Sequence, residues 1–230
     1  MLRYDIVLLD ADETIYDFRL AEKTAVSETL RAFGVEPTDR VIDLYSEGNL
    51  SCWKALERGE LTRDQLKPLR FRMLFERLSL PPVDFRAVND RYEHELSLCG
   101  FLLPGAEDFL KKLRSISGVR IYLATNGFVI PQQGRYRRSG VDKYMDGIYI
   151  SEQVGASKPD PAYFDSLFSD IGVVDRSRAI ILGDSLTSDM LGGRNAGITT
   201  CLYLNGRQHV QSPLCDYQIS DYDGFFDIIM

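Results

Sequence analysis

The sequence contains no long hydrophobic run. Its longest apolar stretches are short segments such as residues 6–9, far below the roughly 20 residues needed to span a bilayer. The N-terminus has no basic region followed by a long apolar stretch, and Asp5 and Asp10 interrupt it early. We therefore expect neither a secretory signal nor a membrane partner.

Histidine is scarce, at two residues, and the four cysteines lie far apart without a CxxC pair. These counts exclude a recognisable zinc site and offer no disulfide framework. A protein with widely spaced, unpaired cysteines is typical of a reducing compartment, so we expect a cytoplasmic location.

No extended block of one charge occurs either. The 27 basic and 34 acidic side chains give a formal net charge of −7, which disfavours non-specific binding to a nucleic acid polymer or an anionic membrane. A phosphorylated small molecule would therefore have to be attracted by a local site. The 230 residues, 44% of them hydrophobic, allow one globular domain or one domain that carries a smaller insertion, as a monomer or homodimer.

Short buried strands alternate with helical segments through most of the chain. This alternation predicts an α/β fold with a parallel sheet covered by helices on both faces. The predicted strands are Tyr4–Asp10, Val119–Thr125, Gly147–Ser151, Ala179–Asp184 and Thr199–Leu204, and the helices between them are Ala106–Ser115, Pro161–Ile171 and Leu186–Ala196.

Residues 18–98 interrupt this alternation. They contain no good strand, and their apolar residues recur at helical spacing. The glycines and prolines of the segment divide it into four or five helices: Gly34, Gly48, Gly59, Pro68, Pro81 and Pro82. We expect a helical domain over residues 17–99, inserted into a core formed by residues 1–16 and 100–230. It could be a structural extension or a lid over a site.

Polar residues gather where the predicted strands end. In an open parallel sheet, ligands bind beyond the carboxyl ends of the strands, near the point where the strand order reverses. Four chain segments would meet there: Asp10-x-Asp12-x-Thr14, Thr125-Asn126-Gly127, Lys158-Pro159-Asp160-Pro161, and Gly183-Asp184-Ser185 with Asp189.

Four carboxylates would thus face a single lysine at this edge. Such a cluster repels itself unless protons or a cation offset the charge, and Mg²⁺ prefers carboxylate oxygens, water and phosphate oxygens as ligands. Magnesium is therefore the expected cofactor. Its predicted ligands are Asp10, the backbone carbonyl of Asp12, and Asp184, with Asp189 as a further ligand or as a residue that orients metal-bound water.

The two aspartates after the first strand can divide the chemistry of phosphate ester hydrolysis. Asp10 would attack phosphorus and form an aspartyl-phosphate, while Asp12 would protonate the leaving oxygen and later deprotonate water. Thr125, Asn126 and Lys158 would bind the phosphoryl oxygens. Taken alone, each segment could also be a simple turn. Asp160 and Pro161 could also be the N-cap and first residue of a helix.

The order of these segments resembles the haloacid dehalogenase superfamily of phosphohydrolases. Asp10-x-Asp12-x-Thr14 is similar to its first motif, Thr125 to the second, Lys158 to the third, and Gly183-Asp184-Ser185-x-x-x-Asp189 to the fourth. The resemblance implies a Rossmann-like core, a magnesium cofactor and a helical cap between the first two motifs.

Within the superfamily, the sequence most resembles the pyrimidine 5′-nucleotidase branch. Glu13 stands where most relatives have glycine, and that branch shares this feature; residues 53–59 and 183–197 are also similar to it. The resemblance implies hydrolysis of a nucleoside 5′-monophosphate, so the expected partner is a small phosphorylated metabolite. Four aromatic residues could stack on a base or fill a core: Tyr16, Phe18, Tyr45 and Trp53.

Several alternatives remain at this point. A sugar-phosphate phosphatase or a phosphoglucomutase would keep the same motifs, and a phosphonate hydrolase would need a lysine from the cap, such as Lys23 or Lys54. Asp12 argues against a dehalogenase, in which the second aspartate is absent. A signalling receiver domain lacks the helical insertion. A phosphate-binding regulatory module without catalysis is the remaining non-enzyme alternative.

Overall fold

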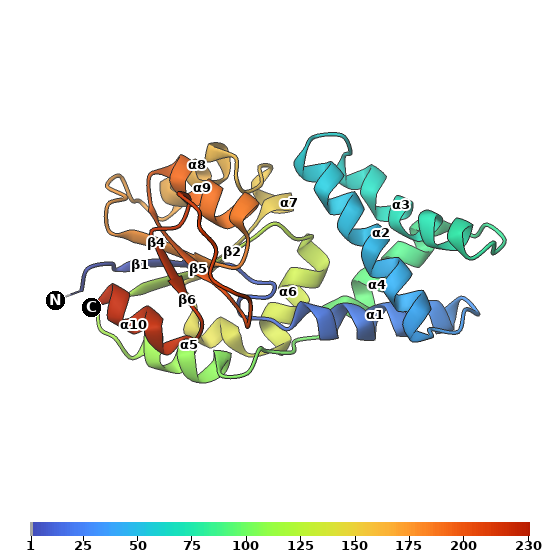
Figure 1. Cartoon of the computed structure of the whole chain (residues 1–230), viewed down its shortest axis with the longest axis horizontal. Coiled ribbons are helices and arrows are strands. Elements are labelled where there is room, and N and C mark those ends of the chain that lie inside the picture. The colour runs from blue at the N-terminus through green and yellow to red at the C-terminus, as the bar shows by residue number, and fades with distance from the viewer. Residues whose placement is uncertain (1) are drawn as a thin grey trace. The chain divides into compact units, whose positions relative to one another are not determined.

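The computed structural model describes residues 2–230 (Figure 1). The chain forms two compact units: one contains the residues up to Phe18 together with Gly100–Met230, and the other contains Arg19–Cys99. The boundaries expected from the sequence, after residues 16 and 99, differ from these by two residues at most. Among residues 2–230, every helix is too short or too polar to cross a bilayer.

The first unit is built around a sheet of six parallel strands in the order β3-β2-β1-β4-β5-β6. This is the strand order of a Rossmann-like fold, so the predicted fold class is confirmed. The strands are β1 (Ile6–Leu9), β2 (Arg120–Thr125), β3 (Gly147–Ile150), β4 (Ala179–Gly183), β5 (Thr199–Tyr203) and β6 (Tyr217–Ile219).

Helices cover both faces of this sheet (Figure 1). Because side chains alternate along a strand, Val7 and Leu9 of β1 pack into the layer that includes α5 and α10, while Ile6 and Leu8 pack into the layer of α8 and α9. The helical elements of this unit are α5 (Ala106–Arg114), α6 (Val129–Arg138), η1 (Val141–Tyr144), α7 (Ser151–Val154), α8 (Pro161–Asp170), η2 (Leu186–Met190), α9 (Leu191–Ala196) and α10 (Asp223–Ile229).

The second unit consists of helices, and α1 enters it from the first unit. Its helices are α1 (Phe18–Ala32), α2 (Asp39–Glu57), α3 (Arg63–Arg77) and α4 (Phe85–Ser97). Thr62 and Gln65 form a capping box at the start of α3, and Asp84 caps α4. Gly48 and Pro68 were expected to separate helices, but they lie inside α2 and α3, where tertiary packing outweighs their low helix propensity.

The helical segment expected over Leu186–Ala196 is present with these bounds, but the type of helix changes along it. It starts as the π-helical turn η2 and continues as α9. The side chain of Asp189 turns back to accept a hydrogen bond from the Ser185 backbone N–H at 3.1 Å, and the Ser185 hydroxyl accepts one from Ser188 N–H at 3.2 Å. These local bonds compete with the regular helical ladder at the turn's start. The sequence prediction also missed α6, β6 and α10.

Candidate active site

The carboxyl ends of three neighbouring strands hold the predicted residues. Asp10 follows β1, Thr125 ends β2, and Asp184 follows β4. Leu9 of β1 pairs with Leu123 and Leu182 of the flanking strands, so these residues emerge at the same edge of the sheet. In the sheet, β2 lies on one side of β1 and β4 on the other, so the strand order reverses at β1. The carboxyl ends of these strands therefore form the topological switch point.

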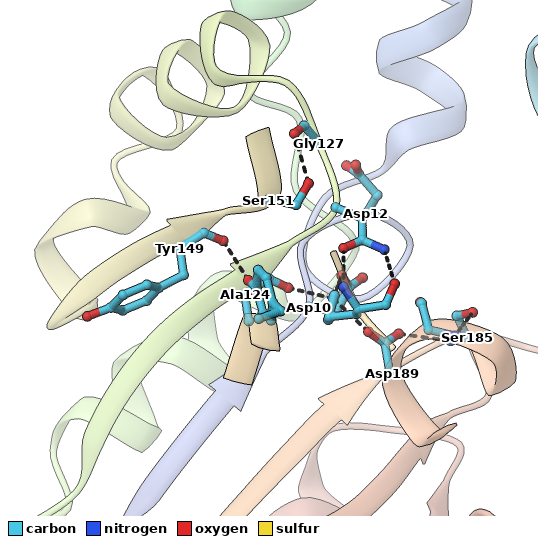
Figure 2. A network of polar contacts seen from close by, with 12 residues as sticks. Asp10, Asp12, Ala124, Gly127, Tyr149, Ser151, Ser185 and Asp189 are labelled. Atoms are coloured by element: carbon cyan, nitrogen blue, oxygen red, sulfur yellow. Dashed lines mark hydrogen bonds and ion pairs between the residues drawn. The ribbon is translucent and has the colours of Figure 1, made fainter. Parts of the chain in front are cut away.

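Lys158 connects the acidic residues at this edge. Its ammonium group donates to Asp10 Oδ1 at 2.7 Å, to Asp189 Oδ1 at 2.7 Å and to the carbonyl oxygen of Ala124 at 2.6 Å. Figure 2 shows Asp10, Asp189 and Ala124 together in this network. The Lys158 and Asp189 side chains are each 1% exposed, so the charges meet where little water screens them.

The pKa values of two carboxyl groups at this site lie above their ordinary range. Burial, followed by repulsion from Asp189, raises the pKa of Asp10 well above its ordinary value, and Lys158 opposes that rise. Burial and repulsion from Asp189 also raise the pKa of Asp184 to about 7. Burial lowers the pKa of Lys158, but the attraction of Asp10 and Asp189 outweighs burial and raises that pKa above its ordinary value.

Asp10, Asp184 and Asp189 form a candidate cation site. Each offers one carboxylate oxygen, and these oxygens lie within 4.8 Å of one another. The side chains of Asp10 and Asp184 are 12% and 20% exposed, so both can be reached from solvent. An oxygen donor set of this kind suits a hard divalent cation, which would also offset the repulsion that raises the pKa of Asp10 and Asp184.

Asp189 is the most enclosed of the three. One of its oxygens accepts from Lys158 and the other from the Ser185 backbone N–H at 3.1 Å. A Cβ at Gly183 would overlap the Asp189 carboxyl group, so the glycine makes room for this arrangement. With both oxygens already engaged, Asp189 is placed to hold Lys158 and the loop after β4.

Asn126, which follows Thr125 at the end of β2, holds the backbone of Lys158. The Asn126 carboxamide donates to the Lys158 carbonyl oxygen at 2.7 Å and accepts from Lys158 N–H at 2.8 Å. These two bonds fix the backbone that carries the lysine, which favours a positioning role for Asn126 over the phosphate contact that the sequence predicted. Thr125 is 2% exposed as the last residue of β2.

Asp12 lies outside the group of three carboxylates. Its Oδ2 accepts from Gln132 Nε2 at 3.0 Å, and its Oδ1 accepts from Arg135, both on α6. The Asp12 side chain is 31% exposed, whereas that of Arg135 is fully buried. The carboxyl group is thus held by protein donors and is still partly open to solvent, as a group that exchanges protons with a ligand requires.

The expectation that one lysine alone faces the four carboxylates is wrong. Arg135 pairs with Asp12, and Arg207 donates to Asp184 Oδ2 at 3.2 Å and to the Asp184 carbonyl oxygen at 3.0 Å. The sequence motifs did not indicate either arginine, and they did not indicate Gln132. The signal for Gln132 and Arg135 was available in their spacing, since residues i and i+3 share one face of a helix that begins soon after Thr125-Asn126-Gly127.

Glu13 occupies a position that favours glycine. Its φ of 59° lies in the left-handed region, which costs roughly 1–2 kcal/mol for a residue with a side chain. Asn205 Nδ2 donates to the Glu13 carbonyl oxygen at 3.4 Å and to its Oε2 at 3.3 Å, and Glu13 N–H donates to the Tyr16 carbonyl oxygen. These bonds hold the loop between Asp12 and the first helix.

Two of the aromatic candidates for base stacking are core residues instead. Tyr16 is fully buried in the core of the first unit. Tyr45 is fully buried in the second unit, where its ring lies 5.0 Å from Phe71 and 5.5 Å from Tyr92 between centroids. Neither can present a ring face to a ligand.

Comparison with known proteins places this geometry in a family. A family model described as haloacid dehalogenase-like hydrolase matches residues 4–197. Pyrimidine 5′-nucleotidase PynA of Streptococcus pneumoniae is 32% identical over 228 residues, covering 98% of this chain and 95% of that protein. Pyrimidine 5′-nucleotidase YjjG of Escherichia coli is 34% identical over 210 residues, covering 91% of this chain and 90% of that protein.

A solved structure gives the same result for the fold. The crystal structure of the HAD-hydrolase YfnB of Bacillus subtilis, described as bound to magnesium, matches with a TM-score of 0.90 at 31% identity, covering 98% of each chain. The matched family segment contains the residues after β1, β2 and β4 as well as Lys158. This chain therefore belongs to the haloacid dehalogenase-like hydrolase family.

Proposed function

We propose that this protein is a magnesium-dependent phosphomonoesterase that hydrolyses nucleoside 5′-monophosphates through an aspartyl-phosphate on Asp10. The observation that carries the proposal is the Lys158 network at the carboxyl ends of β1 and β4. A buried ammonium group bridges Asp10 and Asp189 there, and Asp184 lies beside them. This combination suits a carboxylate nucleophile that must approach an anionic ester.

The three clustered carboxylates fit Mg²⁺, and Asp10 and Asp184 are its proposed protein ligands, together with the Asp12 backbone carbonyl. When bound, the cation neutralises charge on the phosphoryl oxygens and on the carboxylates around them. Arg207 and Asn205 brace the loops that carry these ligands, through Asp184 and Glu13 respectively.

In the first half of the reaction, an Asp10 oxygen attacks phosphorus while the bond to the leaving oxygen breaks. The Asp12 carboxyl supplies the proton that the leaving alkoxide takes up, so that the alcohol departs neutral. The ammonium of Lys158 compensates the negative charge that Asp10 and the phosphoryl group bring together. Thr125 is proposed to donate its hydroxyl to a phosphoryl oxygen.

In the second half, water attacks the phosphorus of the aspartyl-phosphate. Asp12, now ionised, takes a proton from that water, and the bond between phosphorus and Asp10 breaks. Inorganic phosphate and the free Asp10 carboxylate result, and Asp12 is again protonated for the next cycle. Retention of the phosphoryl group for transfer to a sugar, as in a mutase, would require water to be kept from this step.

The proposed substrate class rests on similarity rather than on a contact. Two relatives named pyrimidine 5′-nucleotidases match this chain over nine-tenths or more of its length. Glu13, which stands where most relatives have glycine, is a feature that the pyrimidine 5′-nucleotidase branch shares. The helical unit of residues 19–99 is proposed to act as the cap that selects the leaving group.

A hydrolysis screen tests this proposal. Phosphate release should be measured with Mg²⁺ for nucleoside 5′-monophosphates, sugar phosphates and p-nitrophenyl phosphate, with the Asp10→Asn variant as the control for contaminating phosphatases. We expect turnover that depends on both Mg²⁺ and Asp10, with pyrimidine monophosphates such as UMP, dUMP and dTMP preferred. A preference for sugar phosphates would overturn the substrate class, and Asp10-independent turnover would overturn the mechanism.

A further inference from the structure

The side chains that hold Asp12 come from one face of α6. Gln132 Nε2 donates to one Asp12 oxygen at 3.0 Å, and Arg135 donates to the other. Because each oxygen has its own donor, both the direction of the carboxyl group and the orientation of its plane are set. An exposed aspartate without such partners would sample several rotamers.

The Arg135 guanidinium is itself held firmly. Its side chain is fully buried, and its central carbon lies 4.4 Å from the ring centroid of Tyr16 and 5.7 Å from that of Phe18. Tyr16 is fixed in turn, because its hydroxyl lies 3.3 Å from the Ser139 hydroxyl. The arginine that meets Asp12 is therefore part of the packed core.

Gly127 makes space for the second donor. A Cβ on this residue would lie 2.5 Å from both Cγ and Nε2 of Gln132, closer than Cβ atoms come to other heavy atoms in proteins. Gln132 is 3% exposed, so its side chain has little room in which to move away. The absence of a side chain at Gly127 is thus what allows Gln132 to reach Asp12.

We propose that Gln132 and Arg135 are positioning residues that align the Asp12 carboxyl for proton transfer to the leaving oxygen, and that Gly127 is required for this alignment. The inference rests on the proposed function, in which Asp12 is the general acid. Proton transfer demands hydrogen-bond distance and direction, and a displacement of about 1 Å in a reacting group can cost about 100-fold in rate.

Leaving-group chemistry separates this role from a structural one. p-Nitrophenolate departs without help from an acid, whereas the alkoxide of a nucleoside needs a proton. Because Asp12 also deprotonates water in the second half of the reaction, which both substrates share, the informative constant is kcat/KM, which covers the steps up to departure of the leaving group. Loss of a donor to Asp12 should lower kcat/KM for a nucleoside monophosphate by about 10- to 100-fold, but kcat/KM for p-nitrophenyl phosphate by less than about three-fold. General damage to the fold would slow both substrates alike.

The test measures kcat and KM on both substrates for Gln132→Met, Arg135→Met and Gly127→Ala. Arg138→Met is the matched control, because Arg138 is an exposed arginine of the same helix. Melting temperatures show which variants fold. If Arg135→Met does not, Gln132→Met and Gly127→Ala still test the proposal, since both leave the buried arginine in place.

A double-mutant comparison makes the test specific to Asp12. In an Asp12→Asn background, Gln132→Met should have almost no further effect on either substrate, since it acts only through the missing carboxyl. Equal losses of kcat/KM on the two substrates, or a full further loss in the Asp12→Asn background, would overturn the inference while leaving the proposed phosphatase intact. Failure of the wild-type protein to hydrolyse any phosphate ester would overturn the proposed function instead.

Discussion

Replacing Lys158 by methionine should lower the free energy of unfolding by the amount that one buried charge contributes. Methionine has a similar length but no ammonium group, so Asp10 and Asp189 would lose the donor that lies 2.7 Å from each. The Lys158 and Asp189 side chains are almost completely enclosed, and water cannot readily replace the lost bonds. Two carboxylates would then face each other, with Asp184 nearby.

The expected cost follows from this enclosure. Removing one partner of a buried ion pair costs about 3–5 kcal/mol, because the remaining charge stays buried and uncompensated. For a chain of this length, that loss corresponds to a fall of about 6–20 °C in melting temperature, at about 2–4 °C per kcal/mol. Mg²⁺ should recover part of the loss, since a cation between the carboxylates replaces the missing charge.

The assay is thermal unfolding of the wild-type protein and Lys158→Met at neutral pH, with and without Mg²⁺. Lys143→Met is the control, because Lys143 is an exposed lysine of the same unit whose charge interacts with Glu107 at the surface; its melting temperature should not change. The deficit of Lys158→Met should shrink as the pH falls towards 4, because Asp10, with its raised pKa, takes up a proton and no longer needs a cation. An unchanged melting temperature for Lys158→Met at pH 7 would show that the Lys158 ammonium group does not stabilise the buried carboxylates.

Three further predictions concern the same site and the second unit. Gly183→Ala should destabilise the protein by about 1–3 kcal/mol in chemical unfolding, because the new Cβ overlaps Asp189, whereas Gly48→Ala, in a helix with open space around it, should stabilise it by about 0.5–1 kcal/mol. The pKa of Asp184 is raised from 3.8 to about 7, so the folded protein binds a proton that the unfolded chain has released. Stability without metal should therefore fall as the pH rises through this window, and the rise in melting temperature caused by Mg²⁺ should grow over the same window; a Mg²⁺ effect independent of pH would contradict this. Asp12→Asn should slow UMP hydrolysis by about 100-fold or more while p-nitrophenol is still released in a rapid burst; equal losses in both would argue against Asp12 as the acid.

The fold could be predicted because its core strands are buried on both faces. Ile6-Val7-Leu8-Leu9 is apolar without alternation, as a central parallel strand requires, and the polar residues after it mark its end. The start of α8 was equally clear: Asp160 accepts a hydrogen bond from Ala162 N–H, and Pro161 opens the helix. β6 was missed because it has only three residues, two of them partly exposed, and so carries almost no hydrophobic pattern.

The site was partly predictable for a different reason. The carboxyl ends of neighbouring parallel strands must meet, so Asp10 and Asp184 could be brought together from strand assignment alone. The residues that offset the charges of the carboxylates could not be predicted in this way. Arg135, for example, lies in a helix of polar composition, and which of its faces is buried becomes clear only in the folded structure. Arg207 likewise follows β5 in a loop, and its bonds to the Asp184 loop depend on side-chain direction rather than on any local pattern.

Asp10 is proposed to carry the phosphoryl group during turnover. The most direct measurement mixes Asp12→Asn with p-nitrophenyl phosphate and Mg²⁺, quenches in acid and locates the phosphoryl group by peptide mass spectrometry, with Asp10→Asn treated in parallel. We expect a phosphorylated peptide with the modification on Asp10, and none in Asp10→Asn. A phosphoryl group on another residue, or burst release of p-nitrophenol without any labelled peptide, would contradict it.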